Sequence, residues 1–314
     1  MGWYAIDALQ DALDETKAFL WPFDRGRWLR LAVIVFFVGG PGGSFGSGLQ
    51  NASQSFGQMS GTGPESPPGA GFEQAIGEVA NRPDLVAILA LVAAVALLLL
   101  VVFGYLAAVF EFVFYRSLVD EQVRIRAGFR KYAWDGVKYA LFRLALLLVI
   151  FGTIGAVIGA LVLSPGLGFA LILPAILLWL LLAVVGFFVH ALAIPTMVVE
   201  ETGFVEALRV TYRRVRGEWK QAGVYLLANV GISIAASVVV GIGMLIGIIA
   251  LAIPLVILGL VLAALAPVLV AIPVLLGVVG LLVVYFAIAV PVQTYVYRWI
   301  LDVHAGFAGV GDAG

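Results

Sequence analysis

The sequence predicts an all-α, polytopic membrane protein. Of its 314 residues, 63 % are hydrophobic and 12 % are charged, whereas soluble domains carry roughly a quarter charged residues. No Asp, Glu, Lys or Arg occurs in residues 85–110, 144–199 or 221–297. About 20 helical residues cross a bilayer, so these runs hold one, two and at least two crossings. They are rich in Leu, Ala, Val and Gly and do not alternate polar with apolar residues, which favours helices over a membrane barrel.

Six crossings account for the apolar runs. We expect them at about residues 28–49, 85–114, 139–163, 169–199, 222–250 and 268–298. Eight crossings are the alternative, because Pro254, Pro267 and Pro273 interrupt the last run. We favour two long helices there, joined by an interfacial or re-entrant segment.

The basic residues predict the orientation. Of the 18 Lys and Arg, 17 fall in the segments 1–30, 111–143 and 200–220 or at Arg298, and Arg82 stands apart. The positive-inside rule then places both termini inside the cell and Arg82 outside. We expect a multi-pass protein of the plasma membrane.

The predicted external loop between the first two crossings has an unusual composition. Residues 39–71 include 11 Gly, 4 Pro and 6 Ser, a composition that buries too little surface to fold alone. Asn51 begins an Asn-Ala-Ser sequon and is a candidate glycosylation site. Apolar residues at helical spacing in 72–79 predict a short helix at the outer interface.

The chain also resembles itself. Residues 25–28 match residues 216–219, and residues 191–195 match residues 287–291, at offsets near one and two periods of about 95 residues. We therefore expect one membrane domain, 1–314, built from three repeated hairpins with cytoplasmic amphipathic segments. The repeats span about 5–116, 120–199 and 200–301, followed by a flexible tail, 302–314.

The amphipathic segment 204–220 predicts a contact surface. An apolar stripe is formed by Phe204, Leu208, Tyr212, Val215 and Trp219. Beside it, at spacings of four, three and four, run Arg209, Arg213, Arg216 and Lys220. Such a helix can lie in the plane of the lipid headgroups, with its Lys and Arg side chains extended to anionic phosphates. Trp219 would lie at the same level. The alternative is a helix packed under the bundle with a solvated basic face.

The first segment is amphipathic too, but acidic. Its apolar stripe is Ile6, Leu9, Leu13 and Leu20, and its acids are Asp7, Asp11, Asp14 and Glu15. Anionic headgroups would repel this face. We expect it to contact a protein partner or the basic face of the third segment.

Residues 193–201 (AIPTMVVEE), followed by 206–208 (EAL) and 217–219 (GEW), resemble a signature of the membrane domain of glycerophosphodiester phosphodiesterases and their stand-alone relatives. The chain resembles in particular the uncharacterised six-helix membrane proteins of halophilic archaea. The resemblance implies a multi-pass helical domain of unknown role. In those phosphodiesterases a separate soluble barrel performs the chemistry, and this chain has no room for one, so no activity is carried over.

Few ionisable residues fall within the predicted spans, and each is a candidate functional group. His190 could exchange protons, bind a ligand, or simply hydrogen-bond a neighbouring helix. Glu111 lies near the inner end of the second crossing, within reach of Arg116 or Arg143. We interpret Glu111, Arg116 and Arg143 as a structural ion-pair group.

A second hypothesis is a cavity. The apolar part of the first crossing is short and runs into Gly39, Gly40 and Pro41, and a broken helix can mark a binding cavity in transporters. Its other candidate lining residues are His190 and the polar stripe Asn229, Ser233 and Ser237. A tilted helix continuing to Leu49 and a helix-packing seam along the polar stripe are the alternatives.

The function we predict is non-enzymatic. The chain has no Cys, no phosphate-loop, hydrolase or metal-spacing motif, and no basic patch typical of nucleic-acid binding, so we expect no cofactor, metal or nucleic-acid partner. We expect an integral membrane protein that binds membrane lipids or organises a membrane complex with another membrane or cytoplasmic protein through helix 204–220. A permease for a small or lipid-like substrate is the alternative.

Overall fold

The computed structural model describes residues 3–39 and 82–309, and every regular element in them is a helix. The sequence predictions for Gly40, Pro41, Asn51, the rest of the 39–71 loop, the short helix at 72–79 and residues 310–314 lie outside the described residues. The helices are α1 (Tyr4–Leu20), α2 (Arg25–Gly39), α5 (Pro83–Val119), α6 (Ile125–Leu163), α7 (Pro165–Phe188), α8 (Ile194–Val199), α9 (Phe204–Gly217), α10 (Trp219–Leu265) and α11 (Ala271–Ala308).

Five helical segments are long and apolar enough to cross a membrane. They are Asp84–Val119, Ile125–Leu163, Pro165–Val199, Trp219–Leu265 and Val268–Ala308. The described part of α2 has 15 residues, about 22 Å of helix, and is not among them. The protein is therefore a helical membrane protein, and the sixth crossing, the threefold repeat and the inside location of the termini stay predictions.

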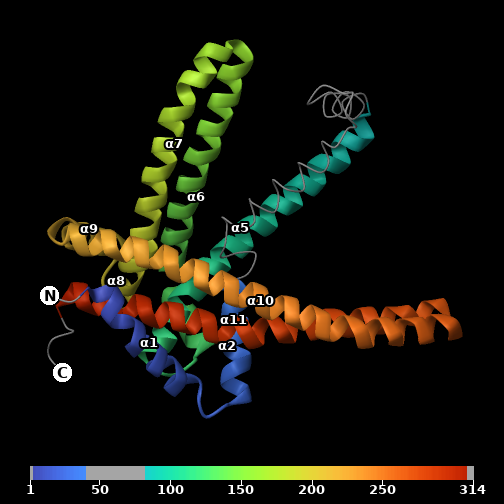
Figure 1. The fold of residues 1–314 in the computed structure, drawn as a ribbon. Coiled ribbons are helices and arrows are strands. Elements are labelled where there is room, and N and C mark those ends of the chain that lie inside the picture. Colours follow the sequence, from blue (N-terminus) through green and yellow to red (C-terminus); the bar gives the residue numbers. More distant parts are fainter. Residues whose placement is uncertain (1–2, 40–81, 310–314) are drawn as a thin grey trace.

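The helices radiate from one packed hub (Figure 1). The hairpin α6–α7, the outer part of α5 and the hairpin α10–α11 leave it in three directions, and the N-terminal helix lies against the C-terminal one. Side chains are buried where the helix ends meet, as in Phe112 to Tyr115 of α5, and exposed along the arms, as in Leu97 to Val102. The arms expose apolar surface because lipid is their solvent, whereas the hub is packed like the interior of a soluble protein.

The last apolar run forms two long helices, and most of the residues predicted to join them as an interfacial or re-entrant segment belong to α10 instead. Helix α10 continues unbroken through Pro254 to Leu265, and a single 3₁₀ turn, Pro267–Val270, leads into α11. At Gly243 and Gly247 a Cβ would lie 2.4 Å from side-chain atoms of Ile288 and Val284. The absence of side chains at these glycines lets α10 and α11 approach closely at this level of the arm.

One prediction about the chain ends is also wrong. Residues 302–308 are not a flexible tail, because α11 continues to Ala308 and buries Val303, His304 and Phe307. At the other end of the chain, helix α1 leaves part of its apolar stripe exposed, since Ile6 is 53 % and Leu13 43 % exposed. It packs on α11 with a different face, whose members are Ala5, Ala8, Ala12, Thr16 and Phe19.

Helix α1 takes this orientation because small side chains allow close approach and polar contacts become available. The Trp299 indole donates a hydrogen bond to the Ala5 carbonyl at 2.8 Å, and the Tyr295 hydroxyl donates to the Leu9 carbonyl at 3.4 Å. Arg298 pairs with Glu15 at 2.9 Å. The acidic first segment thus meets α11, and its predicted contact with the basic face of the third segment is not among these contacts.

A glycine substitution tests the packing of α6 on α5. A Cβ at Gly136 would lie 2.3 Å from Val109 Cγ2 and 3.2 Å from the Val109 Cα. Gly136→Ala is therefore expected to lower the free energy of unfolding by about 1–3 kcal/mol through overpacking, measured by denaturant titration in detergent micelles. The matched control is Gly152→Ala on the same helix, where nothing lies within 4 Å. That change is expected to be neutral or slightly stabilising, and equal losses for both variants would contradict the close α5–α6 approach.

Candidate functional site

The predicted contact helix is divided between two elements. Arg209, Arg213 and Arg216 lie on α9, whereas Trp219 and Lys220 begin α10 after a break at Glu218. All five side chains are exposed, and Trp219 is 68 % exposed. Glu206 pairs with Arg209 at 3.0 Å and with Arg213 at 3.7 Å. One carboxylate thus partly neutralises two guanidinium groups, so the outer face of α9 keeps a net positive charge.

The inner face of α9 differs in part from the predicted apolar stripe. Ala207 and Thr211 are buried, with Phe204, Leu208 and Val215 packed against the core beside them. Tyr212 is 62 % exposed, so it lies with Trp219 among the outward side chains. The exposed face therefore combines four cations with two aromatic rings, a composition typical of the membrane interface.

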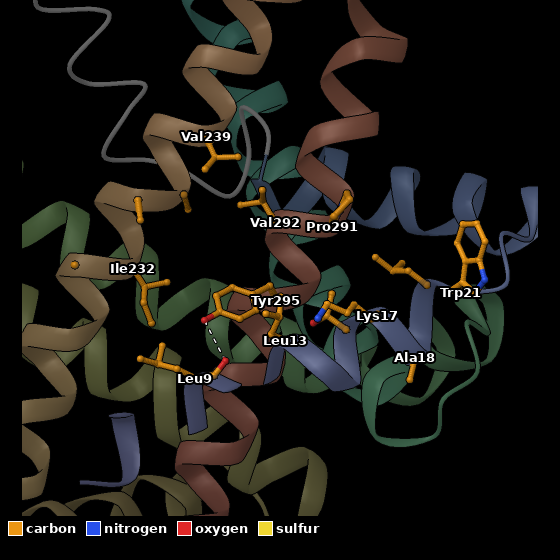
Figure 2. Close-up of a pocket in the computed structure, with 15 residues that line it drawn as sticks. Leu9, Leu13, Lys17, Ala18, Trp21, Ile232, Val239, Pro291, Val292 and Tyr295 are labelled. Carbon is orange, nitrogen blue, oxygen red and sulfur yellow. Dashed lines mark hydrogen bonds between the residues drawn. The ribbon is translucent and has the colours of Figure 1, made fainter. Parts of the chain in front are cut away.

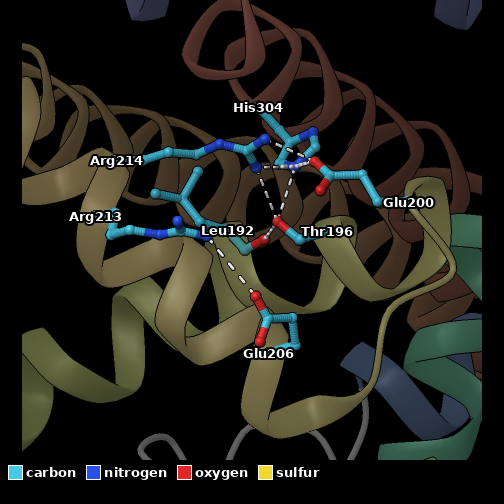
Figure 3. A network of polar contacts seen from close by, with 7 residues as sticks. All are labelled: Leu192, Thr196, Glu200, Glu206, Arg213, Arg214 and His304. Carbon is cyan, nitrogen blue, oxygen red and sulfur yellow. Dashed lines mark hydrogen bonds and ion pairs between the residues drawn. The ribbon is translucent and has the colours of Figure 1, made fainter.

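One arginine of α9 turns inward and anchors the helix (Figure 3). Arg214 donates to Glu200 Oε1 at 2.7 Å, to Thr196 Oγ1 at 3.2 Å and to His304 Nε2 at 3.2 Å. Because arginine only donates, His304 Nε2 must accept, and the Thr196 hydroxyl can give its proton to the Leu192 carbonyl at 2.8 Å. This network ties α9 to α8 and α11. Sequence reasoning missed Arg214, although it follows Ala207 and Thr211 at helical spacing.

The loop before α9 is held by a second acid. Glu201 accepts from Lys131 Nζ at 2.7 Å and pairs with Arg116 at 3.6 Å. The hydrogen bond from Lys131, then the charges of Lys131 and Arg116, lower the pKa of the Glu201 carboxyl below its ordinary value. Adjacent acids thus point to different helices, Glu200 to α9 and α11, and Glu201 to α5 and α6. These residues belong to the stretch 193–201 on which the sequence resemblance rests.

The ion-pair group predicted around Glu111 is present, but His190 takes the place of Arg116 in it. Glu111 is 2 % exposed, pairs with Arg143 at 3.5 Å and contacts His190 Nδ1. The Tyr139 hydroxyl donates to Glu111 Oε1 at 3.4 Å, and the Arg143 guanidinium stacks over the Tyr139 ring. Arg116 does not take part, since it pairs with Asp120 at 2.8 Å and with Glu201. Glu111, Arg143 and His190, here called the Glu111 group, join α5, α6 and the π-helical turn that follows α7.

His190 lies in an irregular turn with a physical cause. Residues Val189–Ala193 form a π-helical turn, and Pro195 follows without a backbone N–H. A backbone N–H at residue 195 would bond the carbonyl of Ala191 in an α-helix or that of His190 in a π-helix. These two carbonyls accept instead from the hydroxyls of Tyr225 and Tyr115, each at 3.5 Å. The turn is thus stabilised by side chains from α5 and α10, and it aims the His190 ring at Glu111.

The residues predicted to line a common cavity do not come together. Gly39 ends α2 against α11, where the Tyr285 hydroxyl donates to its carbonyl at 3.4 Å. His190 belongs to the Glu111 group. Ser233 and Ser237 are exposed on α10, and their hydroxyls bond within their own helix, to Asn229 and to the Ser233 carbonyl. Among the described residues, the hydrogen bonds from the Ser233 and Ser237 hydroxyls thus stay within α10.

The described residues hold no group of three or more His, Cys, Asp and Glu side chains placed to bind a metal ion. The candidate site is therefore the exposed basic and aromatic surface Arg209, Tyr212, Arg213, Arg216, Trp219 and Lys220, here called the α9 surface, together with the Arg214 network that holds it. Such a surface can bind anionic groups without chemical change.

Fold and site together define a multi-pass helical membrane protein with an exposed cationic helix, α9, that hydrogen bonds hold to the hub. The chain belongs to a family of unknown function, DUF7544, whose model matches residues 3–308. Comparison with curated proteins and with solved structures finds no match.

Proposed function

We propose that the protein is a non-enzymatic plasma-membrane protein that binds anionic lipid headgroups on its α9 surface and thereby organises the membrane or a complex next to it. The observation that carries the proposal is a difference in exposure and hydrogen bonding among the arginines of α9. Arg214 is 18 % exposed and donates its hydrogen bonds to residues of the hub, whereas Arg209 and Arg213 are 67 % and 66 % exposed. The cations that remain outside are available for a partner.

Charge and anchoring favour lipid phosphates as that partner. Helix α9 carries four arginines and one acid, Glu206. Basic side chains near an anionic membrane surface contribute about 1 kcal/mol each, and exposed Tyr and Trp rings favour the headgroup region. Because the Arg214 network holds α9 in place, little conformational entropy is lost on binding.

Neutralising the α9 surface tests the proposal. The triple variant Arg209→Gln, Arg213→Gln, Arg216→Gln is expected to lose about 1 kcal/mol of lipid binding for each charge removed. The measurement is retention of phosphatidylglycerol relative to phosphatidylcholine by the purified full chain, read by native mass spectrometry and by vesicle competition at two salt concentrations. Retention of the wild type should also weaken with salt, since screening acts on exposed charges.

The matched control removes the same charge elsewhere. Arg124, Arg126 and Arg130 are exposed on the α5–α6 connection and the first turns of α6, and their triple replacement by Gln should leave lipid retention near the wild-type level. An Arg→Lys triple on α9 should keep most of the binding. Equal losses of lipid retention in both Gln triples would show an effect of total charge and would contradict the proposal. Unchanged retention in the α9 triple would contradict it as well.

A permease for a small or lipid-like substrate is the second candidate, and one observation favours it. The Glu111 group places a buried carboxylate against a histidine and an arginine at a π-helical turn, an arrangement found at functional sites of membrane helices. We rank it second because its other predicted elements, Gly39 and the Asn229 stripe, lie elsewhere on the molecule. The kinship with the phosphodiesterase membrane domain remains a prediction.

A further inference from the structure

An apolar groove lies between α1 and α10, with α11 forming part of its wall (Figure 2). It measures about 1030 Å³, a volume in the range of small-ligand sites. Leu9 and Leu13 of α1 lie on one side and Ile232 and Val239 of α10 on the other, with Val292 of α11 between them. The α10 wall is set back because it also carries Gly231, Ala235 and Ala236.

The groove follows from the way α1 packs. Because α1 turns its small residues toward α11, its larger apolar side chains Leu9 and Leu13 are left beside α10, where nothing among the described residues fills the space. The walls of the groove on α10 and α11 belong to segments long and apolar enough to span a membrane. An apolar chain is the occupant that suits such walls.

Polar groups gather at one end of this apolar space. Thr16 lines the groove and is 6 % exposed, and its hydroxyl has no hydrogen-bond partner among the described residues. A buried hydroxyl without a partner is costly, and threonine in a helix has two accessible χ1 rotamers, so rotation can direct the hydroxyl to a ligand oxygen. Lys17 follows it, and Trp21, 77 % exposed, stands at the end of the groove away from Ile232.

We propose that this groove binds one anionic glycerophospholipid. The acyl chain lies along Ile232, Val239 and Val292, an oxygen at the glycerol level accepts from Thr16, and the phosphate pairs with Lys17. Among the described residues, the Lys17 ammonium pairs only with Asp14, at 3.1 Å, and both side chains are about two-thirds exposed. This weak pair leaves the ammonium able to bind a phosphate. The site is separate from the α9 surface and does not depend on the proposed function.

Filling the groove tests whether it holds the chain. Native mass spectrometry of the full chain, released from vesicles of phosphatidylglycerol and phosphatidylcholine, counts the lipids that stay bound. Ala235→Phe is expected to remove the tightly retained lipid. The matched control is Ala252→Phe on the same helix, exposed and outside the groove, which should retain it. Equal retention in both variants, or a dimer whose formation Ala235→Phe abolishes, would overturn the proposal.

Headgroup selectivity provides a second measurement that does not require a bulky residue. In the α9 triple Gln background, where the α9 surface no longer contributes, the protein is expected to retain phosphatidylglycerol about fivefold better than phosphatidylcholine, the preference that one cation contributes. Adding Lys17→Gln should remove this preference while a lipid remains bound, and adding Thr16→Val should weaken retention of both lipids. Because the α9 surface is neutralised throughout, failure of either site is visible separately. An α9 triple without preference would contradict the anionic headgroup in the groove.

Discussion

Replacing Arg143 with methionine is expected to lower the free energy of unfolding by about 3 kcal/mol, the lower end of the range for breaking a buried ion pair. Glu111 is 2 % exposed and would keep its charge without the guanidinium that lies 3.5 Å away. The Tyr139 hydroxyl and the His190 ring still contact the carboxylate, but neither carries a permanent positive charge. We choose the lower end because the Arg143 side chain is 28 % exposed, so water already compensates part of the pair.

Unfolding in mixed detergent micelles, followed by circular dichroism, measures this loss. Arg209→Met is the control, because it removes an arginine from an exposed pair with Glu206 and should cost less than about 1 kcal/mol. Adding Glu111→Gln to Arg143→Met should recover most of the loss, since a neutral amide no longer needs a cation. If Arg143→Met and Arg209→Met were equally stable, Glu111 would not be the buried charge that ties the hub together.

Replacing Arg214 with methionine is expected to release α9 from the hub. The change removes three hydrogen bonds, to Glu200, Thr196 and His304, and should cost about 2 kcal/mol, the scale of hydrogen bonds to a charged group. The cost is below that of Arg143→Met because Glu200 is 31 % exposed and water can reach it. The local signature is faster amide hydrogen exchange across α9, because opening no longer breaks the network.

Hydrogen exchange read by mass spectrometry resolves α9 from the rest of the chain. Arg216→Met provides the comparison, since Arg216 is exposed on the same helix and its loss should leave exchange unchanged. Lipid retention should fall in both variants. In Arg214→Met it falls because α9 is no longer held to the hub, and in Arg216→Met because an exposed charge is lost. Protection of α9 that survives Arg214→Met would show that apolar packing of Ala207 and Thr211 alone holds the helix.

The sequence by itself determined the class of protein, the five described long helices and the basic face of α9. Each of these depends on local patterns: uncharged length, helical periodicity and the position of basic residues relative to apolar runs. The positions of Arg209, Arg213 and Arg216 could therefore be read correctly as an exposed row. The Glu111–Arg143 pair could be predicted from the sequence because both residues lie near the same predicted membrane boundary, on adjacent helices.

Only the tertiary structure decided which side chains meet across the hub. Arg214 and His304 come from segments 90 residues apart, and no local pattern tells whether two helix ends will pack together. The first segment shows the same limit: its sequence contains an apolar stripe, but the face that lies against α11 carries Ala5, Ala8 and Ala12. Periodicity reveals that a helix has an apolar face, whereas partner choice depends on the shape and polar groups of the helix that it meets.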